Sequence, residues 1–180
     1  GLHKAVIKGK GNYSFTSSVY YRVKYSVPSY AKTTVAKTTY SGKAQAAKIT
    51  VKNGSKTLKA GRDYVVSGTT KAKNAGKYTI KITGKGNYAG SKTITYTISK
   101  CNQKWIGIKT NNTSKKIAVS GVKGKAKVAY ATNNSKVKVS GGKISIAKGV
   151  KSGTKVKITV KVGATKNFNA YKKTITYVVK

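Results

Sequence analysis

Apolar and polar residues alternate along most of this chain with a period of two. Residues 155–162 read KVKITVKV, so Val156, Ile158 and Val160 share one side of an extended backbone and the lysines share the other. This is the pattern of a β-strand with one buried face, because successive side chains of a strand point to opposite faces. The same alternation occurs at 48–52, 77–83, 92–98, 125–130, 136–139, 143–146 and 173–179.

Short turn sequences separate the alternating segments. NGSK at 53–56, KAGRD at 59–63 and GKGN at 84–87 each stand between two of them. Glycine and asparagine are favoured in tight turns because they tolerate positive φ. Short alternating strands joined by such turns predict an all-β chain with a β-sandwich architecture.

One five-residue motif, GKGNY, occurs twice along the chain. GKGNY occurs at 9–13 and again at 84–88, an offset of 84 − 9 = 75 residues, and a looser copy lies at 165–179, where Asn167-Phe168 takes the place of Asn87-Tyr88. We expect this motif to form a closing hairpin in which glycine supplies the positive-φ positions. The repeats then predict three parts: 1–24 as the closing strands of a preceding repeat, 25–99 as one domain and 100–180 as another.

These motifs resemble a known family. YSGK at 40–43, LKAGRDYVV at 58–66 and GKGNYAG at 84–90 are similar to a bacterial immunoglobulin-like (Ig-like) repeat. NNSKVKVSGGKI at 133–144 and NAYKKTIT at 169–176 are similar to the related group-2 bacterial Ig-like fold. The resemblance implies tandem Ig-like β-sandwich domains, used as spacers or adhesion modules in extracellular or bacterial cell-surface proteins. Such repeats usually carry acidic residues, which this chain has almost entirely lost.

The charge of the chain is extreme. It has 39 lysine and arginine residues against a single acid, Asp63, which gives a formal net charge of +38. Only Arg22 and Arg62 are arginines. Self-repulsion on this scale opposes folding, and a negatively charged companion would offset it. We therefore expect an anionic polymer as the partner: DNA or RNA, teichoic acid, polyphosphate or an acidic polysaccharide.

Rows of lysine on the outward strand faces are expected to bind this partner. Alternate residues of a strand lie about 6.6 Å apart on one face, from a rise of ~3.3 Å per residue. Lysine is a point charge, whereas arginine has the planar fork that reads guanine or a single phosphate. Binding should therefore be independent of sequence and should weaken with salt. The candidate polyanion-binding residues are Lys77, Lys81, Lys85, Lys125, Lys127, Lys136, Lys138, Lys155, Lys157 and Lys161.

The residue inventory argues against catalysis, metal binding and a cofactor. Paired-carboxylate hydrolysis needs two acids, and a nucleophile triad needs a histidine with an orienting acid. The chain has one acid, Asp63, expected to accept backbone N–H bonds in its own turn, and one histidine, His3, expected on a strand face. Zinc or calcium would need ligands that the chain lacks. Cys101 is the single cysteine, so no internal disulfide forms.

Alternative functions remain open at this point. A hairpin at 1–23 cannot be stable alone, and Val6, Ile7, Val19 and Tyr21 are candidates for its uncovered apolar face. It would complete a sandwich in a neighbouring subunit of a self-assembling fibre, or it is the end of a repeat in a longer array, which we favour. A lysine-rich spacer without a specific ligand is a further alternative. No segment approaches the ~20 apolar residues of a membrane helix, so no membrane insertion is expected.

Overall fold

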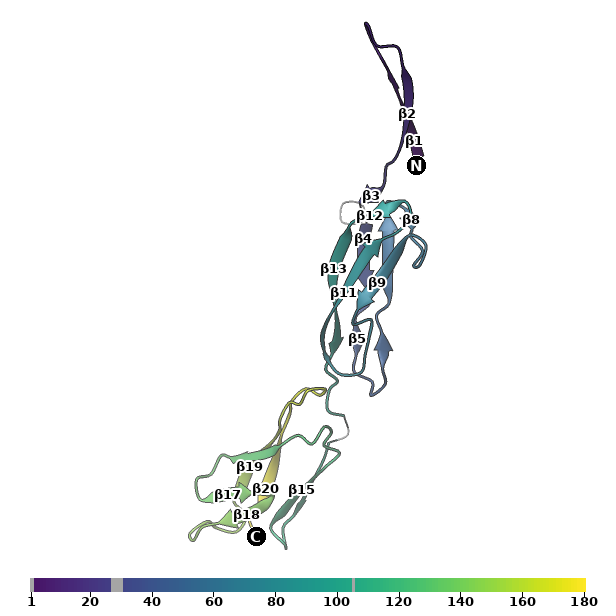
Figure 1. The fold of residues 1–180 in the computed structure, drawn as a ribbon. Coiled ribbons are helices and arrows are strands. Elements are labelled where there is room, and N and C mark those ends of the chain that lie inside the picture. Colours follow the sequence, from purple (N-terminus) through teal and green to yellow (C-terminus); the bar gives the residue numbers. More distant parts are fainter. Residues whose placement is uncertain (1, 27–30, 105) are drawn as a thin grey trace. The chain divides into compact units, whose positions relative to one another are not determined.

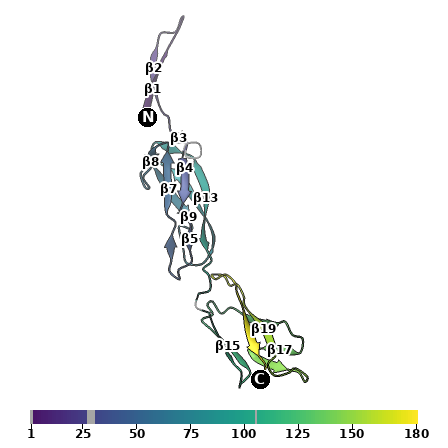
Figure 2. The ribbon, with the colours of Figure 1, turned by 180° about the vertical axis from the view of Figure 1, so that it is seen from behind.

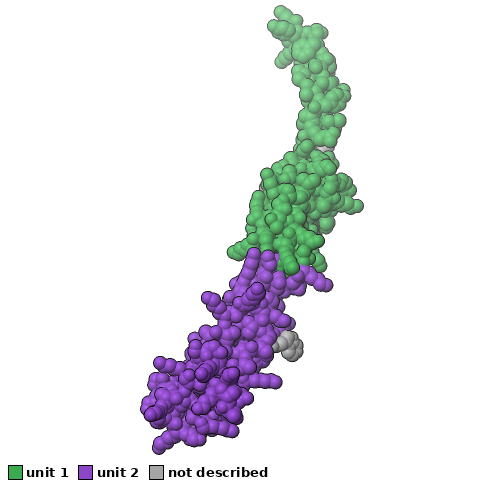
Figure 3. Space-filling view, turned by 60° about the horizontal axis from the view of Figure 1, so that its bottom comes forward, with its two compact units in different colours: residues 1–38, 44–73, 77–97 green, residues 39–43, 74–76, 98–180 purple. Residues whose placement is uncertain are grey.

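The computed structural model describes residues 2–26, 31–104 and 106–180, and every regular element among them is a β-strand (Figure 1). The prediction of an all-β chain is confirmed. The chain forms two compact units (Figure 3). The first comprises Gly1–Thr38, Ala44–Lys73 and Lys77–Thr97, and the second comprises Thr39–Lys43, Asn74–Gly76 and Ile98–Lys180.

Two main sheets form the body of the first unit (Figure 2). One has the strand order β5 (Thr38–Thr39), β13 (Ser91–Ser99), β11 (Gly76–Gly84), β9 (Tyr64–Gly68). The other has the order β4 (Ala31–Val35), β7 (Ile49–Asn53), β8 (Lys56–Thr57). Two short pairs join β6 (Gln45–Ala46) to β10 (Lys71–Ala72) and β3 (Tyr25–Ser26) to β12 (Tyr88–Ala89).

Both main sheets contribute to one core in the first unit. Ala31 and Val51 come from the three-stranded sheet and pack in one cluster with Tyr64 and Ile82 of the four-stranded sheet. Their burial follows the alternation in the sequence, since β11 buries every second residue around Ile82 and exposes the lysines between. Two sheets that bury their inner faces against each other form a β-sandwich type of fold.

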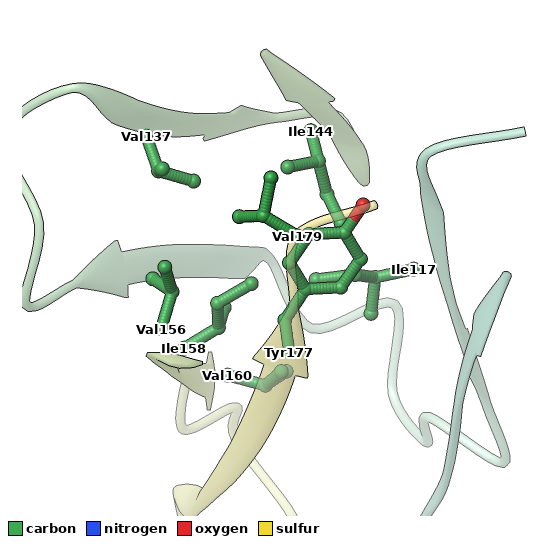
Figure 4. Packing of buried hydrophobic residues seen from close by; sticks show 8 residues of the cluster. All are labelled: Ile117, Val137, Ile144, Val156, Ile158, Val160, Tyr177 and Val179. Carbon is green, nitrogen blue, oxygen red and sulfur yellow. The ribbon is translucent and has the colours of Figure 1, made fainter. Parts of the chain in front are cut away.

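The second unit is built in the same manner. One sheet has the order β14 (Gly107–Asn111), β15 (Lys116–Ser120), β18 (Lys143–Ile146), β17 (Val137–Ser140), and the other has the order β16 (Val128–Thr132), β19 (Lys155–Val162), β20 (Tyr171–Val178). Figure 4 shows Val137 and Ile144 on one side of the core and Val156, Ile158 and Val160 on the other. The predicted inward and outward phases of 155–162 are confirmed.

Two short segments from earlier in the sequence, 39–43 and 74–76, belong to the second unit. The Asn167 side chain accepts a hydrogen bond from the Ala75 backbone N–H at 2.8 Å and donates one to the side-chain oxygen of Asn74 at 3.1 Å. The ring of Phe168 meets the ring of Tyr40 edge-on, with 5.4 Å between the centroids. The third copy of the repeated motif therefore contacts these segments through Asn167 and Phe168.

One predicted strand begins later than the alternation suggested. The segment 125–130 was expected to be extended throughout, but β16 begins at Val128 and Lys125 lies in a turn with φ 54°. Gly124 precedes it with φ 70°, so the chain reverses direction where the sequence still alternates. Lys125 and Lys127 therefore do not form a row on one strand.

The N-terminal hairpin pairs β1 (Leu2–Lys8) with β2 (Thr16–Arg22) in a two-stranded sheet of its own. All residues of both strands are exposed. The register places Ile7, Val19 and Tyr21 on one face. Val6 lies on the opposite face, so its assignment to the same apolar face was wrong, because neighbouring residues of a strand point to opposite sides.

Candidate functional site

Among the described strand registers, lysine stands directly opposite lysine in three pairs. The pairs are Lys161 with Lys172, Lys32 with Lys52, and Lys116 with Lys143, and all six residues are exposed. Side chains directly opposite each other have Cβ atoms about 4.5–5.5 Å apart, and like charges in this arrangement are destabilising. The fold therefore concentrates its charge repulsion at defined positions.

The outward face of the sheet β16-β19-β20 carries one of these pairs within a longer row of lysines. Lys155, Lys157 and Lys161 follow one another on the outward side of β19. On β20, Lys172 lies opposite Lys161, and Thr174 lies opposite Thr159. The two threonine hydroxyls share a hydrogen bond of 2.9 Å, which links the two strands midway along this face. We call the outward side of β16-β19-β20 the lysine face.

A pocket of about 430 Å³ lies at one end of the lysine face. Lys127, Lys161 and Lys172 line it together with the small residue Ala129 and the ring-bearing Tyr171. Ala129 pairs directly with Lys161, and the Lys127 carbonyl accepts a hydrogen bond of 2.9 Å from the Gly163 N–H. Three adjacent chain segments thus bring three lysine side chains to one pocket, whose lining is mainly apolar.

No carboxylate balances these lysines. Residues 100–180 contain 20 lysines and no aspartate or glutamate. The single acid, Asp63, lies in the first unit and is already paired with Arg62, with 2.8 Å between Arg62 Nη2 and Asp63 Oδ2. No Asp or Glu side chain of residues 100–180 therefore offsets the charge of the lysines at the pocket.

The structure distributes the sequence-predicted lysines over several places. Lys127, Lys155, Lys157 and Lys161 come together along the lysine face. The others lie elsewhere: Lys138 on β17, Lys136 and Lys125 in turns, Lys77 and Lys81 on β11, and Lys85 beside the turn that follows it. All ten are exposed. Sequence reasoning missed Lys172, because its place opposite Lys161 depends on the register of the 163–170 connection.

Asp63 stabilises its own turn, as expected. Its side chain accepts a 2.8 Å hydrogen bond from the Lys59 backbone N–H and two from the Arg62 guanidinium. The hydrogen bonds from Arg62 are the largest cause that lowers the pKa of Asp63, to about 2, and the Lys59 N–H adds to them. A carboxylate held in this way is an acceptor in a turn.

The remaining candidate groups are also placed by the structure. The His3 ring stacks on Tyr21 with 5.4 Å between centroids. Cys101 is half-buried, and its backbone forms a bridge to Phe168. Within 2–26, 31–104 and 106–180, no cluster of three or more His, Cys, Asp or Glu side chains could hold a metal ion. The same residues include no helix long and apolar enough to cross a membrane.

No family model matches this sequence, and comparisons with curated proteins and with solved structures find no match either. The function therefore has to follow from the chemistry of the chain itself. Its most distinctive feature is the group of lysines without counter-charge at the pocket of the lysine face.

Proposed function

We propose that this protein is a non-catalytic, cationic binding module that engages anionic polymers through its lysines. The observation that carries the proposal is the convergence of Lys127, Lys161 and Lys172 on one pocket, in a unit without acidic side chains. A polymer with repeated negative charges would relieve the repulsion between Lys161 and Lys172 and displace the counterions around them. Affinity would arise mainly from counterion release.

The chemistry of lysine favours binding without sequence selectivity. An ammonium group is a compact point charge on a flexible stem, and it lacks the bidentate geometry that distinguishes one base or phosphate from another. The hydroxyls of Thr159 and Thr174 hydrogen-bond to each other at 2.9 Å, and no arginine lies on this face to read a base or a phosphate with a planar fork. Nucleic acid, teichoic acid, polyphosphate and acidic polysaccharide all present the charge repeat that such a face would bind.

The repeat motifs support an Ig-like assignment for the two sandwich-type units and, through it, a place at a bacterial surface or outside the cell. In that setting the module would hold an anionic polymer against a rigid sheet scaffold. The ten lysines predicted from the sequence would act together with Lys172, and the lysine face of the second unit would be the strongest single contact.

The test removes the three pocket lysines. A Lys127→Gln, Lys161→Gln, Lys172→Gln variant has a net charge of 38 − 3 = +35. If each lysine contacts a phosphate of duplex DNA, the negative slope of log K against log salt should become shallower by about 2.7, and affinity at 0.1 M salt should fall about eightfold per lost contact. Fluorescence anisotropy with labelled DNA between 20 mM and 300 mM salt measures both quantities.

A matched control separates the lysine face from net charge. Lys109, Lys148 and Lys151 are exposed and lie outside the lysine face, and their replacement by Gln gives the same net charge of +35. The proposal predicts a clearly smaller loss of affinity for this control. Equal losses for the two triple variants would show that binding follows total charge alone, and the lysine face would then have no special role.

A further inference from the structure

The N-terminal hairpin and the central hairpin of the first unit are two copies of one structural element. With the offset of 75 residues, β1 corresponds to β11 and β2 corresponds to β13. His3 stacks on Tyr21 with 5.4 Å between ring centroids, and the corresponding Tyr78 stacks on Tyr96 with 5.3 Å. The turn glycines also agree, because Gly11 has φ 70° and Gly86 has φ 65°.

The two copies differ in what covers them. Ile7 is 50% exposed, whereas its counterpart Ile82 is fully buried. Tyr21 is 50% exposed and Tyr96 only 3%. Isoleucine and tyrosine at corresponding positions are thus part of a core in one copy and of an open surface in the other.

The face that holds Ile7 carries no lysine or arginine. Its members are His3, Ala5, Ile7, Ser17, Val19 and Tyr21. Lys4, Lys8 and Arg22 all lie on the opposite face. In a chain of net charge +38, a strand pair with one side free of fixed charge has the pattern of a surface that becomes buried.

The first unit shows what kind of surface buries this element. There β9 pairs along the outer edge of β11, with Ile82 opposite Val66, and β5 pairs along β13. Ala31, Val51 and Leu58, from the β4-β7-β8 side, close over the face and pack with Ile82. The corresponding edges of β1 and β2 have no partner strand among the described residues.

We propose that the β1-β2 hairpin docks onto an incomplete sandwich of the same repeat type, one that lacks its own last two long strands. The partner supplies a strand like β9 along β1 and an apolar sheet like β4-β7-β8 across Ile7, Val19 and Tyr21. Its inner face is apolar and small-to-medium in size, as Ala31, Val51 and Leu58 are. This surface is separate from the lysine face, so its contacts do not depend on polyanion binding.

The experiment supplies the missing strands. A second copy of residues 25–75 is placed directly before Gly1 of the full chain, so that the junction reproduces the step from residue 75 to 76. Hydrogen exchange of the β1 and β2 amides is compared with the original chain. The proposal predicts that protection of Ile7 and Val19 rises by about two orders of magnitude or more, since fraying elements exchange freely and core strands do not.

Two single substitutions in the extended chain test which face of the hairpin becomes covered. Ile7→Lys places a charge on the face to be covered and should abolish the new protection. Val6→Lys places the same charge on the opposite face and should preserve it. Unchanged exchange in the extended chain, or equal effects of the two lysines, would overturn the proposal.

A second measurement tests whether the hairpin of another molecule, and not an incomplete sandwich, covers the face that holds Ile7. If the original chain dimerises at micromolar concentration in sedimentation velocity, and Ile7→Lys abolishes the dimer, two hairpins cover each other. The incomplete sandwich would then be the wrong partner. A monomer in both cases agrees with the proposal. Salt dependence of DNA binding is measured separately, so failure of one proposal does not imply failure of the other.

Discussion

Lys172→Glu should stabilise the second unit and weaken polyanion binding at the same time. Lys172 lies directly opposite Lys161, and both line the pocket together with Lys127. Directly opposed charges contribute roughly 0.2–1 kcal/mol per pair, with a sign set by the charges. Replacing a repulsive pair by an attractive one therefore predicts a gain of about 0.4–2 kcal/mol in the free energy of unfolding at low salt.

The matched control is Lys109→Glu. Lys109 is exposed on β14 and lies opposite Ala118, so this substitution changes the net charge equally without reversing a lysine pair. Urea unfolding at 20 mM and at 1 M NaCl measures both variants. The advantage of Lys172→Glu over the control should nearly vanish at 1 M, where the Debye length is about 3 Å. Equal stabilisation by both variants at low salt would refute the reasoning, because only net charge would then matter.

Three further predictions concern stability. Ile158→Ala removes a fully buried side chain from the second core and should cost about 2–5 kcal/mol in urea unfolding. Tyr177→Phe should leave stability unchanged or raise it by about 1 kcal/mol, because the buried Tyr177 hydroxyl has no hydrogen-bond partner among the described residues; a clear loss would contradict this. Asp63→Asn should destabilise the first unit at pH 7. Because the pKa of Asp63 falls from 3.8 to about 2 on folding, this difference should shrink as the pH drops from 4 to 2.

The sequence predicts the fold where the burial or the backbone conformation of a residue depends on the residues next to it in the chain. The alternation at 155–162 predicts which side chains are buried, because one face of a strand packs on the core. The positive φ of Gly86 follows from the turn motif GKGN at 84–87. Lys125 shows where prediction from the sequence pattern fails. Lysine rarely adopts a φ of 54°, and the alternating apolar and polar residues around it predict an extended strand.

The candidate site was harder to predict, because it depends on pairing between distant residues. Lys127, Lys155, Lys157 and Lys161 were selected as members of strand rows. The common side of Lys155, Lys157 and Lys161 follows from the alternation along β19, but the places of Lys127 and Lys172 next to it depend on how β16 and β20 pair with β19. The separation of Val6 from Ile7 in the hairpin, by contrast, follows from the period of two and could have been recognised in the sequence.

We propose that the outward lysines bind a negatively charged polymer through charge alone. The most direct measurement is the affinity of the unmodified protein for two DNA duplexes of unrelated sequence, for polyphosphate and for a neutral polysaccharide, as a function of salt. We expect binding to all three polyanions, equal for the two duplexes, with log K falling linearly with log salt, and no binding to the neutral polymer. Absence of binding to every polyanion at 20 mM salt, or a strong preference for one duplex, would contradict it.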